Sequence, residues 1–184
     1  MGTIPAFSTG NIVFLLIDLQ KKLLDRIPRG AEAVAGSVLL LEAGRILGIP
    51  AIVTTQYRKG LGDLAAEIES RAGARILDKM SFSCGADPAI RAEIDRHGRE
   101  WVAVAGVETH ICVLQTALDL LRGGKRVAVV ADAVAARGER DHELALRRME
   151  VAGAALVTKE MLVYELLGRA DSAAFKQILP LIKS

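Results

Sequence analysis

Short apolar runs alternate along this chain with longer segments that have the periodicity of amphipathic helices. The clearest run, residues 101–105, is bounded by Gly106 and followed by a helical segment that stops at Gly123. Six runs are predicted to be strands, at 11–17, 51–55, 75–78, 101–105, 126–131 and 154–157. Continuous apolar runs are typical of parallel strands buried on both faces. We therefore expect an α/β fold, a three-layer α/β/α sandwich with a six-stranded, mostly parallel sheet of Rossmann-like topology.

The segments between the runs supply the expected helices. Helical periodicity, glycine stops and Pro88 at a helix start predict helices at 31–47, 88–97, 112–121, 140–152, 159–167 and 172–182. Residues 21–27 read as a short helical turn or loop, 63–69 as a short helix, and 56–62 as a loop with two glycines.

Length and composition narrow the class of protein. The 184 residues suit one core, so residues 1–184 are expected to form a single domain. A net charge of +2 gives no electrostatic case for binding nucleic acid or an anionic membrane. No apolar stretch approaches the roughly 20 residues of a membrane span, and residues 1–10 do not resemble a signal peptide. With only two cysteines, a reduced cytoplasm is the expected location.

Polar side chains gather directly after the predicted strands. In strand order they are Asp18 and Gln20, Gln56, Lys79, the residues from Glu108 to Cys112, and Asp132. Because the carboxyl ends of parallel strands share one edge of the sheet, where ligands usually bind, these groups could face one pocket.

A thiol, a carboxylate and an ammonium in one pocket suggest nucleophilic catalysis. Cys112, in the first turn of a helix, could attack a carbonyl carbon as a thiolate favoured by the helix dipole. Asp18 could accept the thiol proton and return it to the leaving group, while Lys79 stabilises both negative charges.

Each of these residues also has a purely structural interpretation. Cys112 could be a small buried side chain, Asp18 a cap of the following turn, and Lys79 a solvated loop residue. Gln20 and Gln56 could tie loops together, and Asp132 could brace a loop. Only the combination of these residues at neighbouring strand ends favours a catalytic role.

The chain resembles the isochorismatase-like cysteine hydrolases, the superfamily that includes nicotinamidases, over nearly its whole length. The resemblance rests on IDLQ at 17–20, VTTQY at 53–57, DKMSFS at 78–83 and GVETHICVLQTALDLL at 106–121, with DAVAAR and RRMEVAGA further on. It is closest to the small, metal-free isochorismatase-domain members. The resemblance implies a parallel six-stranded sheet with helices on both sides and a catalytic triad of Asp18, Lys79 and Cys112. It also implies a non-proline cis peptide between Val107 and Glu108, with the backbone N–H groups of Glu108 and Cys112 forming an oxyanion hole.

The chain departs from nicotinamidases at their metal site, because residues 54–60 contain no histidine. His97 is expected to be solvated, His142 to lie on the surface and His110 to line the pocket rim, so we predict no metal and no cofactor. The expected pocket walls are Gln20, Gln56, Tyr57, Phe82, Glu108, Thr109 and His110. Cys84 is interpreted as structural, although it could lie near enough to Cys112 to matter under oxidation.

These features predict a hydrolase of a small amide or related compound that forms an acyl-thioester at Cys112. One alternative is an isochorismate-type vinyl ether hydrolase with Asp18 as the acid, and another is a non-catalytic oligomeric scaffold. Dinucleotide binding and serine hydrolysis are set aside, because neither G-x-G-x-x-G after the first strand nor G-x-S-x-G is present. Expected partners are a small-molecule substrate and further copies of the chain, since an aliphatic chain and the resemblance both favour a homo-oligomer.

Overall fold

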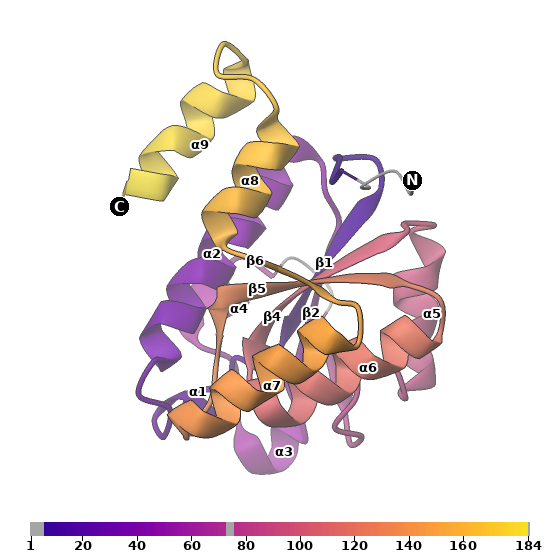
Figure 1. The fold of residues 1–184 in the computed structure, drawn as a ribbon. Coiled ribbons are helices and arrows are strands. Elements are labelled where there is room, and N and C mark those ends of the chain that lie inside the picture. Colours follow the sequence, from indigo (N-terminus) through magenta and orange to yellow (C-terminus); the bar gives the residue numbers. More distant parts are fainter. Residues whose placement is uncertain (1–5, 73–75, 184) are drawn as a thin grey trace.

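The computed structural model describes residues 6–72 and 76–183, and its centre is a twisted six-stranded sheet (Figure 1). The strand order is β3-β2-β1-β4-β5-β6, and neighbouring strands pair in parallel. The strands are β1 (Ile12–Ile17), β2 (Ala51–Gln56), β3 (Ile76–Lys79), β4 (Trp101–Val107), β5 (Arg126–Ala135) and β6 (Ala155–Val157). The predicted fold class is therefore confirmed. The start of the third predicted strand, Arg75, lies outside the described residues.

Strand β1 is the middle of the sheet and shows why apolar runs predicted it. All six of its side chains are buried. Val13, Leu15 and Ile17 point to one face, whereas Phe14 and Leu16 point to the other, so both faces need apolar side chains. Its pairing with β4 ends at Ile17 opposite Gly106, which brings the two functional strand ends side by side.

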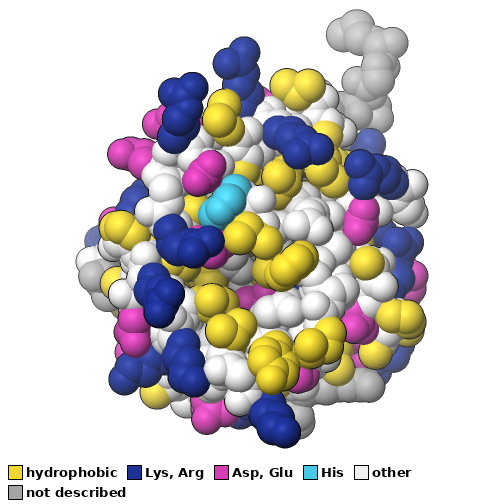
Figure 2. All heavy atoms as spheres, turned by 90° about the horizontal axis from the view of Figure 1, so that it is seen from below, with side chains coloured by type: hydrophobic (Ala, Val, Ile, Leu, Met, Phe, Trp, Pro, Cys, Tyr) yellow, Lys and Arg dark blue, Asp and Glu magenta, His cyan; other side chains and the backbone are white. Residues whose placement is uncertain are grey.

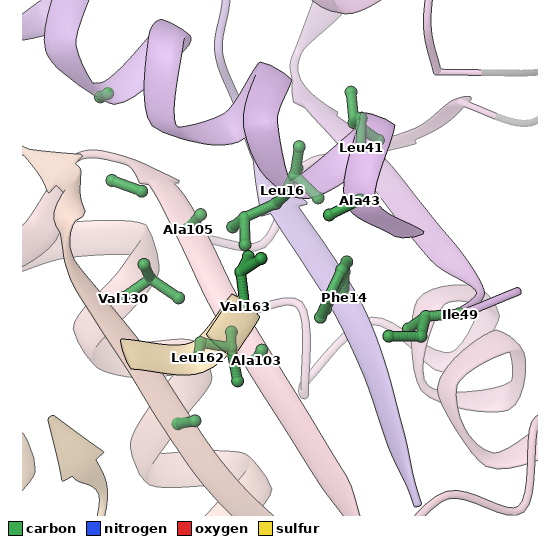
Figure 3. Close-up of a cluster of buried hydrophobic side chains, with 14 of the residues drawn as sticks. Phe14, Leu16, Leu41, Ala43, Ile49, Ala103, Ala105, Val130, Leu162 and Val163 are labelled. Atoms are coloured by element: carbon green, nitrogen blue, oxygen red, sulfur yellow. The ribbon is translucent and has the colours of Figure 1, made fainter. Parts of the chain in front are cut away.

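Helices cover both faces of the sheet and close the core. On one face lie α2 (Gly30–Leu47), α8 (Lys159–Leu167) and α9 (Ala173–Lys183). Figure 3 shows Phe14 and Leu16 close to side chains from the first two of these helices, Ala43 and Val163. The opposite face is covered by α5 (Pro88–Arg96), α6 (Leu114–Arg122) and α7 (Glu139–Val151).

Short helices follow the carboxyl ends of β1, β2 and β4. They are α1 (Lys21–Leu24), α3 (Arg58–Leu61), α4 (Ala66–Glu69) and the π-helical turn η1 (Thr109–Val113). Helix α3 corrects the prediction of a loop at 56–62. Tyr57 takes a left-handed conformation, and Gly60 lets the Tyr57 ring lie where a Cβ atom would otherwise stand, 2.1 Å from that ring. The glycines that suggested a loop thus permit one tight helical turn.

Strand β5 is longer than predicted. The polar residue Asp132 suggested an end at 131, but the strand continues to Ala135 after an irregularity in its pairing with β4. Asp132 therefore lies inside the strand, where its carboxylate accepts hydrogen bonds from the backbone N–H and Nζ of Lys159. The bracing role considered for Asp132 is the one observed.

Within the described ranges 6–72 and 76–183, the structure contains no helix of the length and hydrophobicity needed to cross a bilayer.

Candidate active site

The candidate site lies at the carboxyl edge of the sheet, where four elements each contribute one polar side chain. Asp18 directly follows β1, Gln56 ends β2, Lys79 ends β3, and Cys112 lies in η1 after β4. Asp18 has a positive φ of 53°, uncommon for a residue with a Cβ atom, and its backbone N–H bonds to the carbonyl of Thr54. This bend keeps the carboxylate at the sheet edge.

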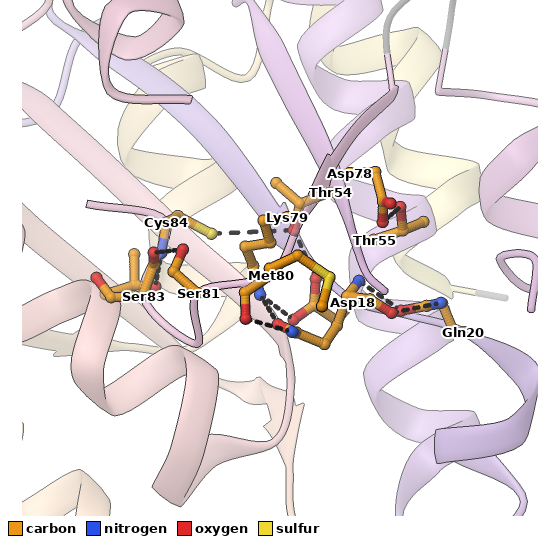
Figure 4. Close-up of polar contacts among 12 residues, drawn as sticks. Asp18, Gln20, Thr54, Thr55, Asp78, Lys79, Met80, Ser81, Ser83 and Cys84 are labelled. Carbon is orange, nitrogen blue, oxygen red and sulfur yellow. Dashed lines mark hydrogen bonds and ion pairs between the residues drawn. The ribbon is translucent and has the colours of Figure 1, made fainter. Parts of the chain in front are cut away.

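Asp18 and Lys79 form a fully buried ion pair (Figure 4). Lys79 Nζ donates to Asp18 Oδ2 at 2.6 Å and to Gln56 Oε1 at 2.7 Å. Thr54 Oγ1 donates to the other carboxylate oxygen, Asp18 Oδ1, at 2.8 Å. A buried ion pair is tolerable only when further hydrogen bonds compensate for lost hydration, and Gln56 and Thr54 supply them here.

Burial and the ion pair act in opposite directions on the pKa values of these two groups. Burial raises the pKa of the Asp18 carboxyl. The positive charge and hydrogen bond of Lys79 oppose that rise, as do the contacts with Thr54 and Cys112. Burial acts to lower the pKa of Lys79, but Asp18, Cys84 and Cys112 act in the other direction, and the pKa is raised overall. Lys79 is therefore an ammonium at neutral pH.

Cys112 is the third member of the cluster. Its thiol interacts electrostatically with the Asp18 carboxylate, and the residue is 6% exposed. Burial, and then the negative charge of Asp18, raise the pKa of the Cys112 thiol, while Lys79 acts to lower it. This corrects the expectation that a helix N-terminus favours the thiolate. Cys112 lies inside a π-helical turn before α6 begins at Leu114, and burial beside a carboxylate outweighs the helix dipole.

The backbone before Cys112 has the predicted cis peptide bond between Val107 and Glu108. The Glu108 carbonyl then accepts hydrogen bonds from the N–H groups of Ile111 and Val113, the residues on either side of Cys112. The Glu108 carboxylate is held by Arg137, whose backbone N and Nε each lie 3.0 Å from Oε2. The oxyanion hole of Glu108 and Cys112 remains a prediction.

Comparison with known proteins places this arrangement in a family. The family model described as "Isochorismatase domain" matches residues 13–161, which include all of the clustered side chains.

The chain belongs to the isochorismatase family.

Individual relatives agree with this assignment. Isochorismatase domain-containing protein 1 of Salmo salar is 37% identical over 172 residues, which are 94% of this chain and 61% of that protein. The chain thus spans less than two thirds of this relative's length.

Two solved structures share the fold. MAR1 ribonuclease from Caenorhabditis elegans has a TM-score of 0.91 and 37% identity, over 98% of this chain and 93% of that chain. YcaC from Pseudomonas aeruginosa, described with hexane-2,5-diol and covalent acrylamide, has a TM-score of 0.90 and 25% identity, over 98% and 93% of the two chains.

The predicted pocket residues of this isochorismatase domain divide into buried and open groups. Gln20 is fully buried, and its amide bonds to backbone groups of Gln56 and Gly62, which is the loop-tying role considered for it. Thr109 is also fully buried. Both side chains are therefore closed off from solvent. In contrast, Tyr57 and Phe82 are 45% and 54% exposed at the rim.

The positions of the three histidines can be compared with those expected, and His142 differs most. His142 is predicted to lie on the surface, but it is 8% exposed, and its Nδ1 lies 2.9 Å from Thr109 Oγ1. The partner of His142 is 33 residues away, so helical periodicity could not identify the contact. His110 is half-buried near Cys112, with an Nδ1 atom that has no hydrogen-bond partner among the described residues. His97 contacts Glu93 of the helix that it follows, α5.

Cys84 is buried beside the cluster. Its sulfur lies 3.9 Å from Thr54 Oγ1, and its backbone N–H donates to Thr116 Oγ1 at 2.9 Å. Burial, and then the charge of Asp18, raise the pKa of the Cys84 thiol to about 12. These contacts agree with the structural role expected for Cys84.

A hollow lies at the same edge of the domain, and Asp18, Lys79 and Cys112 do not line it. Glu108 and Arg137 line a cavity of about 400 Å³ together with Lys22, Arg26 and Leu61. Figure 2 views the molecule from below Figure 1 and shows Lys and Arg side chains mainly around the margin, with hydrophobic side chains towards the middle. In the part of the chain that the structure describes, no three His, Cys, Asp or Glu side chains come close enough together to hold a metal ion.

Proposed function

We propose that this isochorismatase-family chain is a cysteine hydrolase of a small amide or related compound. The observation that carries the proposal is the buried cluster in which the Cys112 thiol interacts with Asp18, a carboxylate held in turn by Lys79. A nucleophile hydrogen-bonded to a base, with a third group orienting that base, is the usual arrangement of covalent catalysis.

The chemistry follows from the protonation states. Because the Cys112 thiol is protonated at rest, Asp18 must accept its proton as sulfur attacks the carbonyl carbon. Lys79 stabilises the negative charge of the cluster, and the backbone N–H groups of Glu108 and Cys112 would receive the oxyanion. Asp18 then gives the proton to the departing amine, leaving an acyl-thioester. Water, deprotonated by Asp18, cleaves the thioester to an acid and restores the thiol.

Covalent acrylamide in Pseudomonas aeruginosa YcaC supports an electrophile-reactive site in a protein of this fold.

The second candidate is hydrolysis of a vinyl ether, with Asp18 as the acid. The raised pKa of the Asp18 carboxyl favours it, because an acid catalyst must hold a proton before it donates one. Cys112 would then be dispensable.

The test compares four forms of the protein on one panel of substrates. Wild type, Cys112→Ala, Asp18→Asn and Cys84→Ala are assayed against small amides, an isochorismate-type vinyl ether and RNA, the last because the Caenorhabditis elegans relative is described as a ribonuclease. We expect amide turnover that falls at least about 10³-fold in Cys112→Ala and Asp18→Asn. Cys84→Ala, which removes the other buried thiol, is expected to stay within about threefold of wild type.

Each contrary result has a definite meaning. Full amide turnover by Cys112→Ala would exclude the acyl-thioester. Vinyl ether hydrolysis that needs Asp18 but not Cys112 would establish the second candidate. Cleavage of RNA alone would replace the amide class, and inactivity on the whole panel, with Cys112 unreactive to amide electrophiles, would favour a non-catalytic scaffold.

A further inference from the structure

Two consecutive residues at the start of η1 are each hydrogen-bonded to a side chain from the region of α7. One of these side chains lies just before the helix and the other lies in its first turn. Glu108 is bound by Arg137, and Thr109 is bound by His142. Cys112 comes three residues after Thr109. We propose that Arg137 and His142 are positioning residues that fix the start of η1 and thereby the Cys112 sulfur relative to Asp18. The proposal rests on the function proposed for Cys112.

Glu108 passes this restraint to the backbone around the nucleophile. Its carboxylate accepts from Arg137 twice, once from the backbone and once from the side chain. Its carbonyl oxygen accepts from the N–H groups of Ile111 and Val113, at 3.0 and 3.3 Å. These residues flank Cys112, so a shift of Glu108 would move both backbone neighbours of the sulfur.

The contact between His142 and Thr109 fixes the first residue of η1 in a buried position. Thr109 is fully buried and His142 is 8% exposed, so neither polar group can readily exchange its partner for solvent. Burial, and then the charge of Arg29, lower the pKa of His142, while Glu143 and Glu139 act to raise it. The imidazole is therefore neutral at pH 7, and its Nδ1 atom can accept a hydrogen bond from the Thr109 hydroxyl.

Arg137 and His142 belong to a layer outside the reacting groups. His142 borders a cavity of about 320 Å³ with Arg29, Ala136 and Arg137. Asp18, Lys79 and Cys112 do not line this cavity. Both side chains therefore act on the nucleophile through Glu108 and Thr109, and a displacement of about 1 Å at a reacting atom can cost about 100-fold in rate.

The experiment separates the hydrogen bond from the bulk of the ring. Asparagine places an amide group near the position of histidine Nδ1, whereas leucine fills the space without a polar atom. The variants are His142→Asn, His142→Leu, Thr109→Ser, Thr109→Val and Arg137→Gln. His97→Leu is the matched control, a histidine exchanged elsewhere in the fold, at the C-terminal cap of α5.

Three measurements are made on each variant: kcat and KM on the amide that wild type cleaves, the rate of Cys112 alkylation by iodoacetamide, and deuterium uptake at residues 108–113. We expect His142→Leu, Thr109→Val and Arg137→Gln to lower kcat by about 10- to 100-fold with KM within about twofold, and to raise deuterium uptake. By the same argument, His142→Asn and Thr109→Ser should return to within about threefold of wild type, as should His97→Leu.

Unchanged kcat, alkylation rate and deuterium uptake in His142→Leu and Arg137→Gln would overturn the proposal. Equal impairment of His142→Asn and His142→Leu would also overturn it for His142, because ring packing would then be the cause. Arg137 is 55% exposed at its side chain, so its variant tests the idea even if the His142 variants do not fold. Failure of the proposed function is distinguishable, because it appears as full activity of Cys112→Ala whatever the positioning variants do.

Discussion

Removal of the buried Lys79 ammonium should strongly destabilise the folded state. Without its ammonium, the buried Asp18 carboxylate keeps only neutral hydrogen-bond donors such as Thr54. We expect Lys79→Met to lower the free energy of unfolding by about 3–5 kcal/mol at pH 7. Urea denaturation followed by circular dichroism measures the change.

The loss of stability in Lys79→Met should depend on pH. Burial already raises the pKa of Asp18 above its unfolded value, and losing the opposing charge of Lys79 raises it further. Between the unfolded and the folded pKa of Asp18, the folded protein binds a proton that the unfolded protein does not. The free energy of unfolding of the variant therefore falls as pH rises through this range. The gap to wild type should therefore be smallest at acidic pH, and equal gaps at about pH 5 and pH 8 would contradict this account.

Lys159→Met provides the control for charge removal. Its ion pair with Asp132 is partly exposed, so we expect a cost within about 1 kcal/mol. The double variant Asp18→Asn, Lys79→Met should recover much of the stability lost in Lys79→Met, because it leaves no unpaired buried charge.

At the scale of elements, the close pairing of β1 and β4 depends on one glycine. Gly106 has a φ of 114°, and a Cβ atom there would stand 2.1 Å from the carbonyl oxygen of Ile17. Backbone of a central strand cannot yield to this contact. We expect Gly106→Ala to cost at least about 4 kcal/mol or to prevent folding, measured by thermal unfolding and soluble yield.

Gly98→Ala is the control for Gly106→Ala, because it tests the cost of a positive φ without a steric clash. Gly98 also has a positive φ, of 60°, but nothing lies within 4 Å of the position that a Cβ atom would take there. Its replacement should cost only about 1–2 kcal/mol, the usual penalty for a left-handed residue with a side chain. Similar losses for the two variants would mean that close approach to β1 is unimportant.

At the scale of the whole molecule, we predict a homo-oligomer. Large apolar side chains are exposed beside the candidate site, where Met80 is 69% and Phe82 54% exposed. Light scattering at micromolar concentration should give a multiple of the 19.7 kDa chain mass. A mass equal to one chain would contradict the prediction. That residues 1–184 form one domain also remains a prediction.

The sequence predicted the sheet more accurately than the loops. Apolar runs such as β1 are unambiguous because both faces of a parallel strand must be buried. The end of β5 and the helix α3 were missed, since Asp132 and the glycines near Tyr57 are ordinary turn signals locally. The end of β5 depends on its pairing with β4, which is distant in sequence. The helical turn α3 depends on how the Tyr57 ring packs over Gly60, which residue types alone do not reveal.

Local patterns along the chain were enough to predict the succession of strands and helices, and with it which polar residues reach the carboxyl edge of the sheet. The state of these residues follows from contacts made on folding: Cys112 is a protonated thiol beside the Asp18 carboxylate, and His142 is a buried partner of Thr109. The reason is physical. Hydrophobic periodicity is a local property that sequence displays, whereas a pKa or a buried hydrogen bond depends on desolvation and on groups brought together from distant positions.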